Sequence, residues 1–202
     1  MLCVILSART GNCTESMNML SKKPDYQWYV IYTRANGEKK LCSSLQEKKI
    51  ECYLPLRKVL RYWSEQRKWI EEPWFKGYLF VKASYREFFT ILNTPGVVCY
   101  VSYGGKAQPI AETQIDSIKT MVQQNDKEVT LTYKNIRKGR KAEVISGSLK
   151  GVRGELVEIL NEKRILVRIE SMNCSLHADL SGNQVRMTDQ PAFAFEEKKI
   201  AY

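Results

Sequence analysis

The sequence predicts an α+β protein in two parts: a four-stranded, mainly antiparallel sheet with about three helices, then a small β-barrel. Three observations support this prediction. Strand and helix patterns alternate up to residue 123, but consecutive strand patterns occupy the middle of that region. Beyond residue 135, short strand patterns are separated by glycine turns. Hydrophobic residues make up 44% of the 202 residues, which is enough to bury packed cores.

The first part is expected to span residues 26–123, after a disordered lead-in at residues 1–25 that lacks sustained periodicity. Gln27–Arg34 is predicted to be a strand because β-branched and aromatic residues fill it. Glu38–Lys49 is predicted to be an amphipathic helix, since Leu41 and Leu45 stand one helical turn apart.

The rest of the first part is predicted to contain strands, a hairpin and two more helices. Ser84 and Glu87 have the spacing of a capping box, which predicts that a short helix begins there and runs through Leu92. The remaining elements expected in this part are a strand at 51–59, a hairpin at 60–70, strands at Tyr78–Lys82 and Val97–Tyr103, a turn at Gly104-Gly105 and a helix at Glu112–Gln123.

The second part is expected to span residues 136–187. Residues 124–135 are polar without a period and are predicted to be a linker, and residues 188–202 are predicted to be a flexible tail. Ile165–Ile169 alternates β-branched residues, which favours a strand. We expect Gly147 and Gly154 to adopt positive φ in tight turns.

The net charge of +10 and the pI near 9.3 favour a polyanionic partner, with nucleic acid first and an acidic membrane surface second. A role in solubility alone is the remaining alternative. No apolar run approaches the roughly 18 residues that a membrane span requires.

Catalysis and metal binding lack the residues they need. The chain has one histidine, His177, and six cysteines without a Cys-x-x-Cys pair, so no metal site is expected. Nucleotide-binding and nucleophile-elbow glycine motifs are absent from the sequence. We therefore expect no enzyme and no cofactor. The scattered cysteines indicate reduced thiols in a cytoplasmic protein.

Basic and aromatic residues alternate in the predicted hairpin. Cations fix phosphates and aromatic rings stack on bases, so this pattern favours nucleic-acid binding. The alternative is a ribbon whose aromatic rings pack on one another while its charges are solvated. Within the segment only Glu65 opposes the positive charge. The hairpin residues are Arg57, Lys58, Arg61, Tyr62, Trp63, Arg67, Lys68 and Trp69, and Arg34, Lys39 and Lys40 are candidate extensions.

The stretch Glu72–Val81 is the candidate partner-binding strand. Its bulky residues alternate, so both faces of the strand carry large side chains. One face can be satisfied by the core of the sheet. The other face is then expected to be an exposed apolar patch, and such patches mark partner sites.

Five segments resemble, in order and spacing, the NusG-type transcription elongation factors. They are Trp28–Val30, Pro73–Val81, Asn93–Val97, Gln108–Ile110 and, resembling the KOW motif, Ile145–Glu155. The resemblance covers residues 26–187 and implies a five-stranded SH3-like KOW barrel. Its motif residues are Gly147, Lys150, Gly151 and Gly154.

The resemblance also implies partners. Family members bind the clamp helices of bacterial RNA polymerase and touch the non-template DNA strand, and the KOW domain of some binds a ribosomal protein. Arg34, Lys40 and the basic hairpin map near the DNA side. The residues implied for polymerase binding are Phe75, Tyr78, Phe80, Val101 and Tyr103. A monomer is expected.

Gly77–Val81 is more similar to the specialised UpxY and RfaH branch than to the housekeeping factor. UpxY-type proteins antiterminate long polysaccharide operons. Two positions depart from the family. RfaH carries His-Thr-Thr where this chain has Phe88-Phe89-Thr90, and Lys76 replaces the commoner proline. The alternatives are a housekeeping elongation factor and an RNA- or ribosome-binding module dominated by its KOW domain. We predict strands, not the helical hairpin of RfaH, for residues 136–187.

Overall fold

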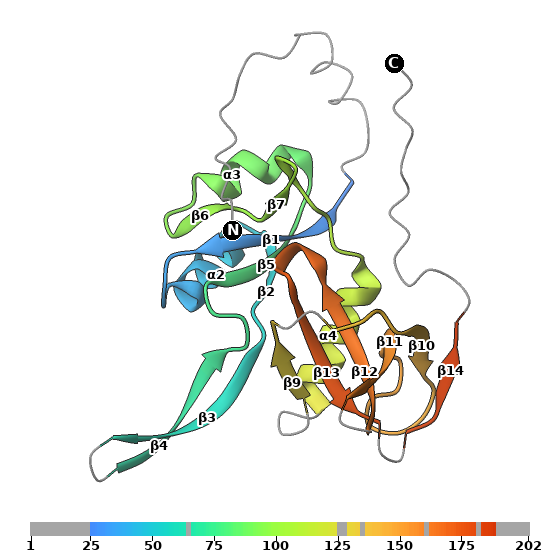
Figure 1. The fold of residues 1–202 in the computed structure, drawn as a ribbon. Coiled ribbons are helices and arrows are strands. Elements are labelled where there is room, and N and C mark those ends of the chain that lie inside the picture. The colour runs from blue at the N-terminus through green and yellow to red at the C-terminus, as the bar shows by residue number, and fades with distance from the viewer. Residues whose placement is uncertain are drawn as a thin grey trace, which may run out of the picture. The chain divides into compact units, whose positions relative to one another are not determined.

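The computed structural model describes residues 25–63, 66–124, 129–133, 136–159, 162–180 and 183–188 (Figure 1). The chain divides into two compact units, Met1–Ile110 and Ala111–Tyr202. Apart from Asp25 and Thr188, the segments predicted as lead-in and tail lie outside the described residues. No helix in the described ranges is long and apolar enough to span a membrane.

The first unit is built on a four-stranded antiparallel sheet in the order β2-β5-β1-β6, which confirms the predicted sheet. β1 and β5 lie at its centre and pair from Gln27↔Ala83 to Tyr32↔Tyr78. The strands are β1 (Gln27–Thr33), β2 (Glu51–Tyr53), β5 (Tyr78–Ala83) and β6 (Val97–Tyr100).

One face of this sheet carries the core of the unit. Helix α2 (Glu38–Glu47) brings Leu41 and Leu45 into a buried cluster with Ile31 and Leu79, as its amphipathic pattern predicted. The predicted capping box is present, with the Ser84 backbone N–H donating to Glu87 Oε2 at 2.9 Å. It opens a 3-10 turn, η1 (Tyr85–Glu87), which leads into α3 (Phe88–Leu92).

Strands β3 (Leu56–Trp63) and β4 (Gln66–Pro73) form a two-stranded ribbon that projects from this unit (Figure 1). The sequence predicted a strand at 51–59 and a hairpin confined to 60–70. The chain instead breaks before Leu56, because Pro55 has no N–H to continue a strand ladder. The Trp74 N–H donates to the Pro55 carbonyl at 2.8 Å and closes the base of the ribbon.

The predicted strand at Val97–Tyr103 is divided in two. β6 ends at Tyr100, and β7 (Ser102–Tyr103) turns back to pair with β8 (Lys106–Ala107). The turn is Gly104-Gly105, as predicted, and both glycines have positive φ. At the break, the Val101 N–H still donates to the Val30 carbonyl at 2.9 Å.

The second unit contains a six-stranded antiparallel sheet in the order β14-β10-β11-β12-β13-β9. Helix α4 (Glu112–Gln124) packs against β11 and β12, where Ser117 Oγ accepts the Arg153 N–H at 3.0 Å. The strands are β9 (Val129–Thr132), β10 (Arg140–Val144), β11 (Arg153–Ile159), β12 (Glu162–Ile169), β13 (Cys174–Asp179) and β14 (Val185–Met187), and the turn η2 (Glu170–Met172) joins β12 to β13. The described elements between residues 140 and 187 are therefore mainly strands, as predicted.

Two boundaries differ from the sequence prediction. The expected linker contains β9, a sixth strand, which pairs with β13 from Val129↔Ala178 to Thr132↔Ser175. Alternation of Val129 and Leu131 with threonines is too short to distinguish a strand from a polar loop. α4 was assigned to the first part but belongs to the second unit. Its apolar stripe predicts a buried face without specifying which sheet it covers.

The cysteine prediction holds in part. Cys42, Cys52 and Cys174 carry free thiols, as expected. Cys99 is disulfide-bonded, contrary to the expectation of six reduced thiols. Spacing along the chain excludes zinc motifs but does not measure which sulfurs meet in space.

Candidate functional site

The sheet of the first unit has a second face, opposite the helices, that is rich in aromatic rings. Side chains alternate along a strand, so the neighbours of the core residues Ile31, Leu79 and Tyr100 point the other way. All four strands contribute to this second sheet face. Its residues are Trp28, Val30, Tyr32, Tyr53, Tyr78, Phe80 and Cys99.

The centre of the second sheet face is buried, which corrects the expectation of an exposed apolar strand. Phe75 and Phe80 have no exposed surface and Tyr78 is 9% exposed. The Phe80 ring packs edge-on to Phe75, with centroids 5.6 Å apart, and lies 6.1 Å from the Tyr53 ring. Burial raises the pKa of Tyr53 to about 12.

Val101 and Tyr103 remain accessible. Val101 follows β6 and is partly exposed, and Tyr103, the last residue of β7, is 82% exposed. An aromatic side chain this exposed buries little surface and therefore contributes little to the stability of the folded chain. Of the five residues predicted to bind polymerase, these two therefore offer contact area without rearrangement.

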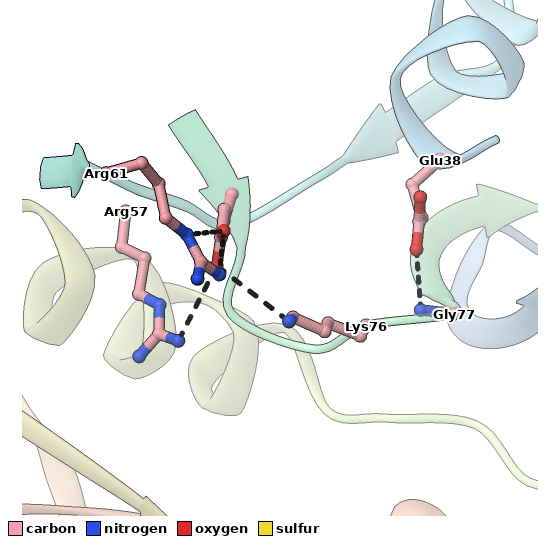
Figure 2. Close-up of polar contacts among 6 residues, drawn as sticks. Glu38, Arg57, Arg61, Lys76 and Gly77 are labelled. Atoms are coloured by element: carbon pink, nitrogen blue, oxygen red, sulfur yellow. Dashed lines mark hydrogen bonds and ion pairs between the residues drawn. The ribbon is translucent and has the colours of Figure 1, made fainter. Parts of the chain in front are cut away.

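The loop that carries Phe75 is fixed by Glu38 at the start of α2. Glu38 is 5% exposed, and its Oε1 accepts the Gly77 N–H at 2.7 Å (Figure 2). Gly77 has φ +79°, and a Cβ there would lie 3.1 Å from the Tyr32 ring. Sequence reasoning missed Glu38, because an acidic first-turn residue is also explained by the helix dipole.

The register of the ribbon sorts its residues onto two sides. Directly paired residues share a side, and successive residues alternate. The pairs Arg57↔Glu72 and Arg61↔Lys68 define what we call the arginine side. The pairs Lys58↔Glu71, Leu60↔Trp69 and Tyr62↔Arg67 define the aromatic side. The sequence had suggested one mixed patch.

On the arginine side, one carboxylate faces three cations (Figure 2). Glu72 Oε1 accepts bonds from Arg61 Nε at 3.0 Å and Nη2 at 2.6 Å. Arg57 Nη2 and Lys76 Nζ each lie 3.9 Å from Oε2. The Arg61 hydrogen bond is the main reason that the pKa of Glu72 is lowered. The cluster keeps an excess of positive charge. Glu65, which opposes the positive charge within the predicted hairpin, lies outside the described residues.

The aromatic side presents two exposed rings. Tyr62 is 68% and Trp69 65% exposed, and the Arg67 guanidinium lies 5.4 Å from the Tyr62 ring centroid. An open depression of about 530 Å³ adjoins Trp69 and is lined by Lys58, Trp69, Ile70 and Glu71. The Trp63 side chain is outside the described part of the ribbon. Rings with adjacent cations can stack on unpaired bases.

Of the candidate extensions, Arg34 is exposed after β1, and Lys40 is exposed on α2. The neighbouring Lys39 Nζ lies 3.6 Å from Glu71 Oε2 of β4. This ion pair places the first turn of α2, which also carries Lys40, beside the ribbon, whereas Arg34 lies in the turn between β1 and α2.

The KOW-like glycines lie between and within β10 and β11. Gly147 and Gly151 have positive φ, whereas Gly154, predicted to do so, is a strand residue of β11. Gly154 is required for another reason: a Cβ there would collide with the Leu166 carbonyl oxygen of β12. Lys150 is exposed in the turn, and its N–H donates to the Gly147 carbonyl at 3.2 Å.

Two sequence comparisons with known proteins point to one family. Residues 26–119 match the family described as "Transcription termination factor nusG". Proteins named "Transcription termination/antitermination protein NusG" from Streptococcus pyogenes serotypes M1 and M3 are 29% identical over 154 residues, covering 69% of this chain and 84% of theirs. A solved structure titled "Domain interaction in Thermotoga maritima NusG" aligns with 82% of this chain and 98% of that chain, at TM-score 0.45 and 20% identity.

The family match spans the sheet, the ribbon and the loop that fills the second sheet face, and it agrees with the resemblance seen in the sequence motifs. The sequence relatives extend the likeness across most of their own length. Residues 26–119 of this chain match the NusG family, and 69% of the chain aligns with NusG proteins.

Proposed function

We propose that this NusG-like transcription termination/antitermination factor docks on the clamp helices of elongating bacterial RNA polymerase through its second sheet face. Docking there suppresses pausing and termination. The surface comprises Phe75, Tyr78, Phe80, Val101 and Tyr103. Because Phe80 is fully buried in this structure, the proposal requires that the centre of the face become accessible in the bound state.

The observation that carries this proposal is the chemistry of the second sheet face. Three of the four strands, β1, β2 and β5, contribute aromatic side chains to it, although a sheet needs only one such face for a core. Exposed Tyr103 at its margin adds an aromatic anchor, the residue type enriched at binding hot spots.

The ribbon supplies the nucleic-acid contact in this proposal. Arg57, Arg61 and Lys68 on the arginine side hold phosphates of the non-template DNA strand, and Tyr62 and Trp69 on the other side stack on its unpaired bases. Arg34 and Lys40 extend the positive charge. The ribbon projects from the sheet, so the two contacts are physically separate (Figure 1).

The target operons are the most specific part of the proposal. Similarity of Gly77–Val81 to the UpxY and RfaH branch supports long polysaccharide-type operons. Nascent-transcript sequencing with and without the protein checks this. Read-through confined to such operons is expected, whereas a uniform effect on all transcripts contradicts the specialised role.

The docking surface is tested by co-precipitation with core polymerase. Tyr103→Ala should weaken binding at least roughly tenfold, because a ring at a hot spot contributes on the order of 1.4 kcal/mol or more. Tyr85→Ala is the matched control: Tyr85 is 64% exposed on η1 and lies outside the surface. Equal binding by the two variants contradicts the assigned face. Both substitutions are at exposed residues, so neither threatens folding.

A further inference from the structure

Two cysteines of the first unit meet beneath its helices, away from the second sheet face and the ribbon. Cys42 lies on α2 and Cys52 on β2, and their Sγ atoms are 2.8 Å apart. Cys52 Sγ also lies 3.4 Å from the Cys42 carbonyl oxygen. Both side chains are half-buried against the hydrophobic core, so they remain partly accessible to solvent.

We propose that Cys42 and Cys52 form a reversible dithiol–disulfide site, whose substrate class is low-molecular-weight disulfides such as oxidised glutathione. A disulfide bond is about 2.05 Å long, so the two sulfurs need to approach by only about 0.8 Å. Each sits at a fixed point of the fold: Cys42 between the core residues of α2, and Cys52 paired with Val81 of β5.

The two thiols differ in the way that thiol–disulfide exchange requires. The hydrogen bond with Cys52 lowers the pKa of Cys42, and the same bond, followed by burial, raises the pKa of Cys52. Cys42 is therefore the attacking thiolate. Its sulfur breaks the S–S bond of oxidised glutathione, giving a Cys42–glutathione mixed disulfide and one glutathione thiolate.

The second step closes the site. Cys52 attacks the Cys42 sulfur and releases a second glutathione, and its proton passes to a departing thiolate. Overall, two protein thiols and one oxidised glutathione give one protein disulfide and two reduced glutathiones. The Cys42–Cys52 pair loses two electrons and glutathione disulfide gains them, so no other oxidant is needed.

The disulfide would fasten an edge strand to a helix. β2 has three residues and pairs only with β5 among the described strands. Joining it to α2 also restrains Tyr53, the neighbour of Cys52, whose ring lies against Phe80. Cross-linking removes conformations from the unfolded chain, so oxidation should raise the unfolding temperature.

The experiment uses the full chain, reduced, desalted and then incubated with oxidised glutathione. Alkylation and trypsin digestion without reductant follow, because Lys48 and Lys49 separate the two cysteines. The expected product is Leu41–Lys48 linked to Ile50–Arg57. Cys174 is the internal control: it is free and buried, and burial raises the pKa of its thiol to about 12, so it should stay unmodified.

Two variants sharpen the result. Cys52→Ser should stop at the Cys42–glutathione adduct, since the resolving thiol is gone. In the parent, oxidation should raise the unfolding midpoint by roughly 5 °C or more, and Cys42→Ser/Cys52→Ser should show no such rise. The proposal is overturned if both peptides are recovered singly and alkylated, or if Cys42 is linked to a cysteine other than Cys52.

Discussion

Two clusters of charged residues in this molecule use the same groups in opposite ways. In the second unit, Arg168 Nε and Nη2 each bond one oxygen of Glu155, both at 3.0 Å. Both side chains are 16% exposed, and the Gly139 N–H and the Ile136 carbonyl satisfy further atoms. In the ribbon, Glu72 alone faces Arg57, Arg61 and Lys76.

The two clusters differ in whether their charges are balanced. The Glu155–Arg168 pair is balanced, and both carboxylate oxygens accept hydrogen bonds, so it joins β11 to β12 and leaves no net charge for a ligand. The cluster around Glu72 has three cations for one carboxylate, and two of its ion pairs are as long as 3.9 Å. An unbalanced cluster on a projecting ribbon is suited to a polyanion. Charge balance therefore separates structural ion pairs from binding residues here.

The largest expected effect breaks the balanced pair. Arg168→Met leaves the Glu155 carboxylate without its cation in a mostly buried site, which should lower the free energy of unfolding by roughly 3 kcal/mol. Denaturant unfolding of the full chain measures this. Arg140→Met, at an exposed arginine of β10, is the matched control and should change little. A loss equal to that of the control contradicts the structural role.

The same pair gives the second unit an acid sensitivity. Desolvation acts to raise the pKa of Glu155, but the bonds from Arg168 and Gly139 outweigh it and the pKa is lowered from 4.5. A carboxyl with a lowered folded pKa contributes stability above its unfolded pKa and loses it as the pH falls through the folded value. Unfolding curves below pH 4.5 should therefore converge for the parent and Glu155→Gln, and separate above it.

Sequence reasoning identified residues whose role depends on local pattern. Leu41 and Leu45 were placed in the core because helical period alone reveals a buried stripe, and the Ser84–Glu87 capping box is equally local. The cluster around Glu72 was missed because Glu72 lies eleven residues from Arg61, and the register that brings the two strands together is not evident from the sequence. Burial of Phe80 was missed because rings from β2 and the β4–β5 loop cover it.

Trp69→Ala tests DNA binding by the ribbon and is expected to have the next largest effect. Loss of one stacking ring should weaken binding to single-stranded DNA by roughly 1–2 kcal/mol, on the order of tenfold, and leave the unfolding free energy nearly unchanged. Fluorescence anisotropy with a labelled oligonucleotide measures it. Tyr26→Ala, at a 49%-exposed tyrosine before β1, is the control. Equal weakening of binding to double-stranded DNA would contradict stacking on unpaired bases.

Glu72→Gln has the smallest expected effect, but it is the one substitution here that is expected to increase DNA affinity. Removing the only carboxylate of the cluster frees Arg61, Arg57 and Lys76 from it, so DNA affinity should increase a few-fold and depend more steeply on salt. Arg61→Gln should do the reverse, reducing the salt slope by about 1. Anisotropy titrations at several salt concentrations measure both slopes.

The opposite signs of these two substitutions are what a merely structural cluster cannot produce. If Glu72 existed to hold the ribbon together, as Glu155 holds β11 to β12, either substitution would break the same bonds and both would weaken DNA binding along with folding. If the arginines existed to bind phosphate, the carboxylate competes with DNA for them, and removing it must strengthen binding. A loss of affinity in Glu72→Gln would therefore assign the ribbon cluster to the same class as the balanced pair.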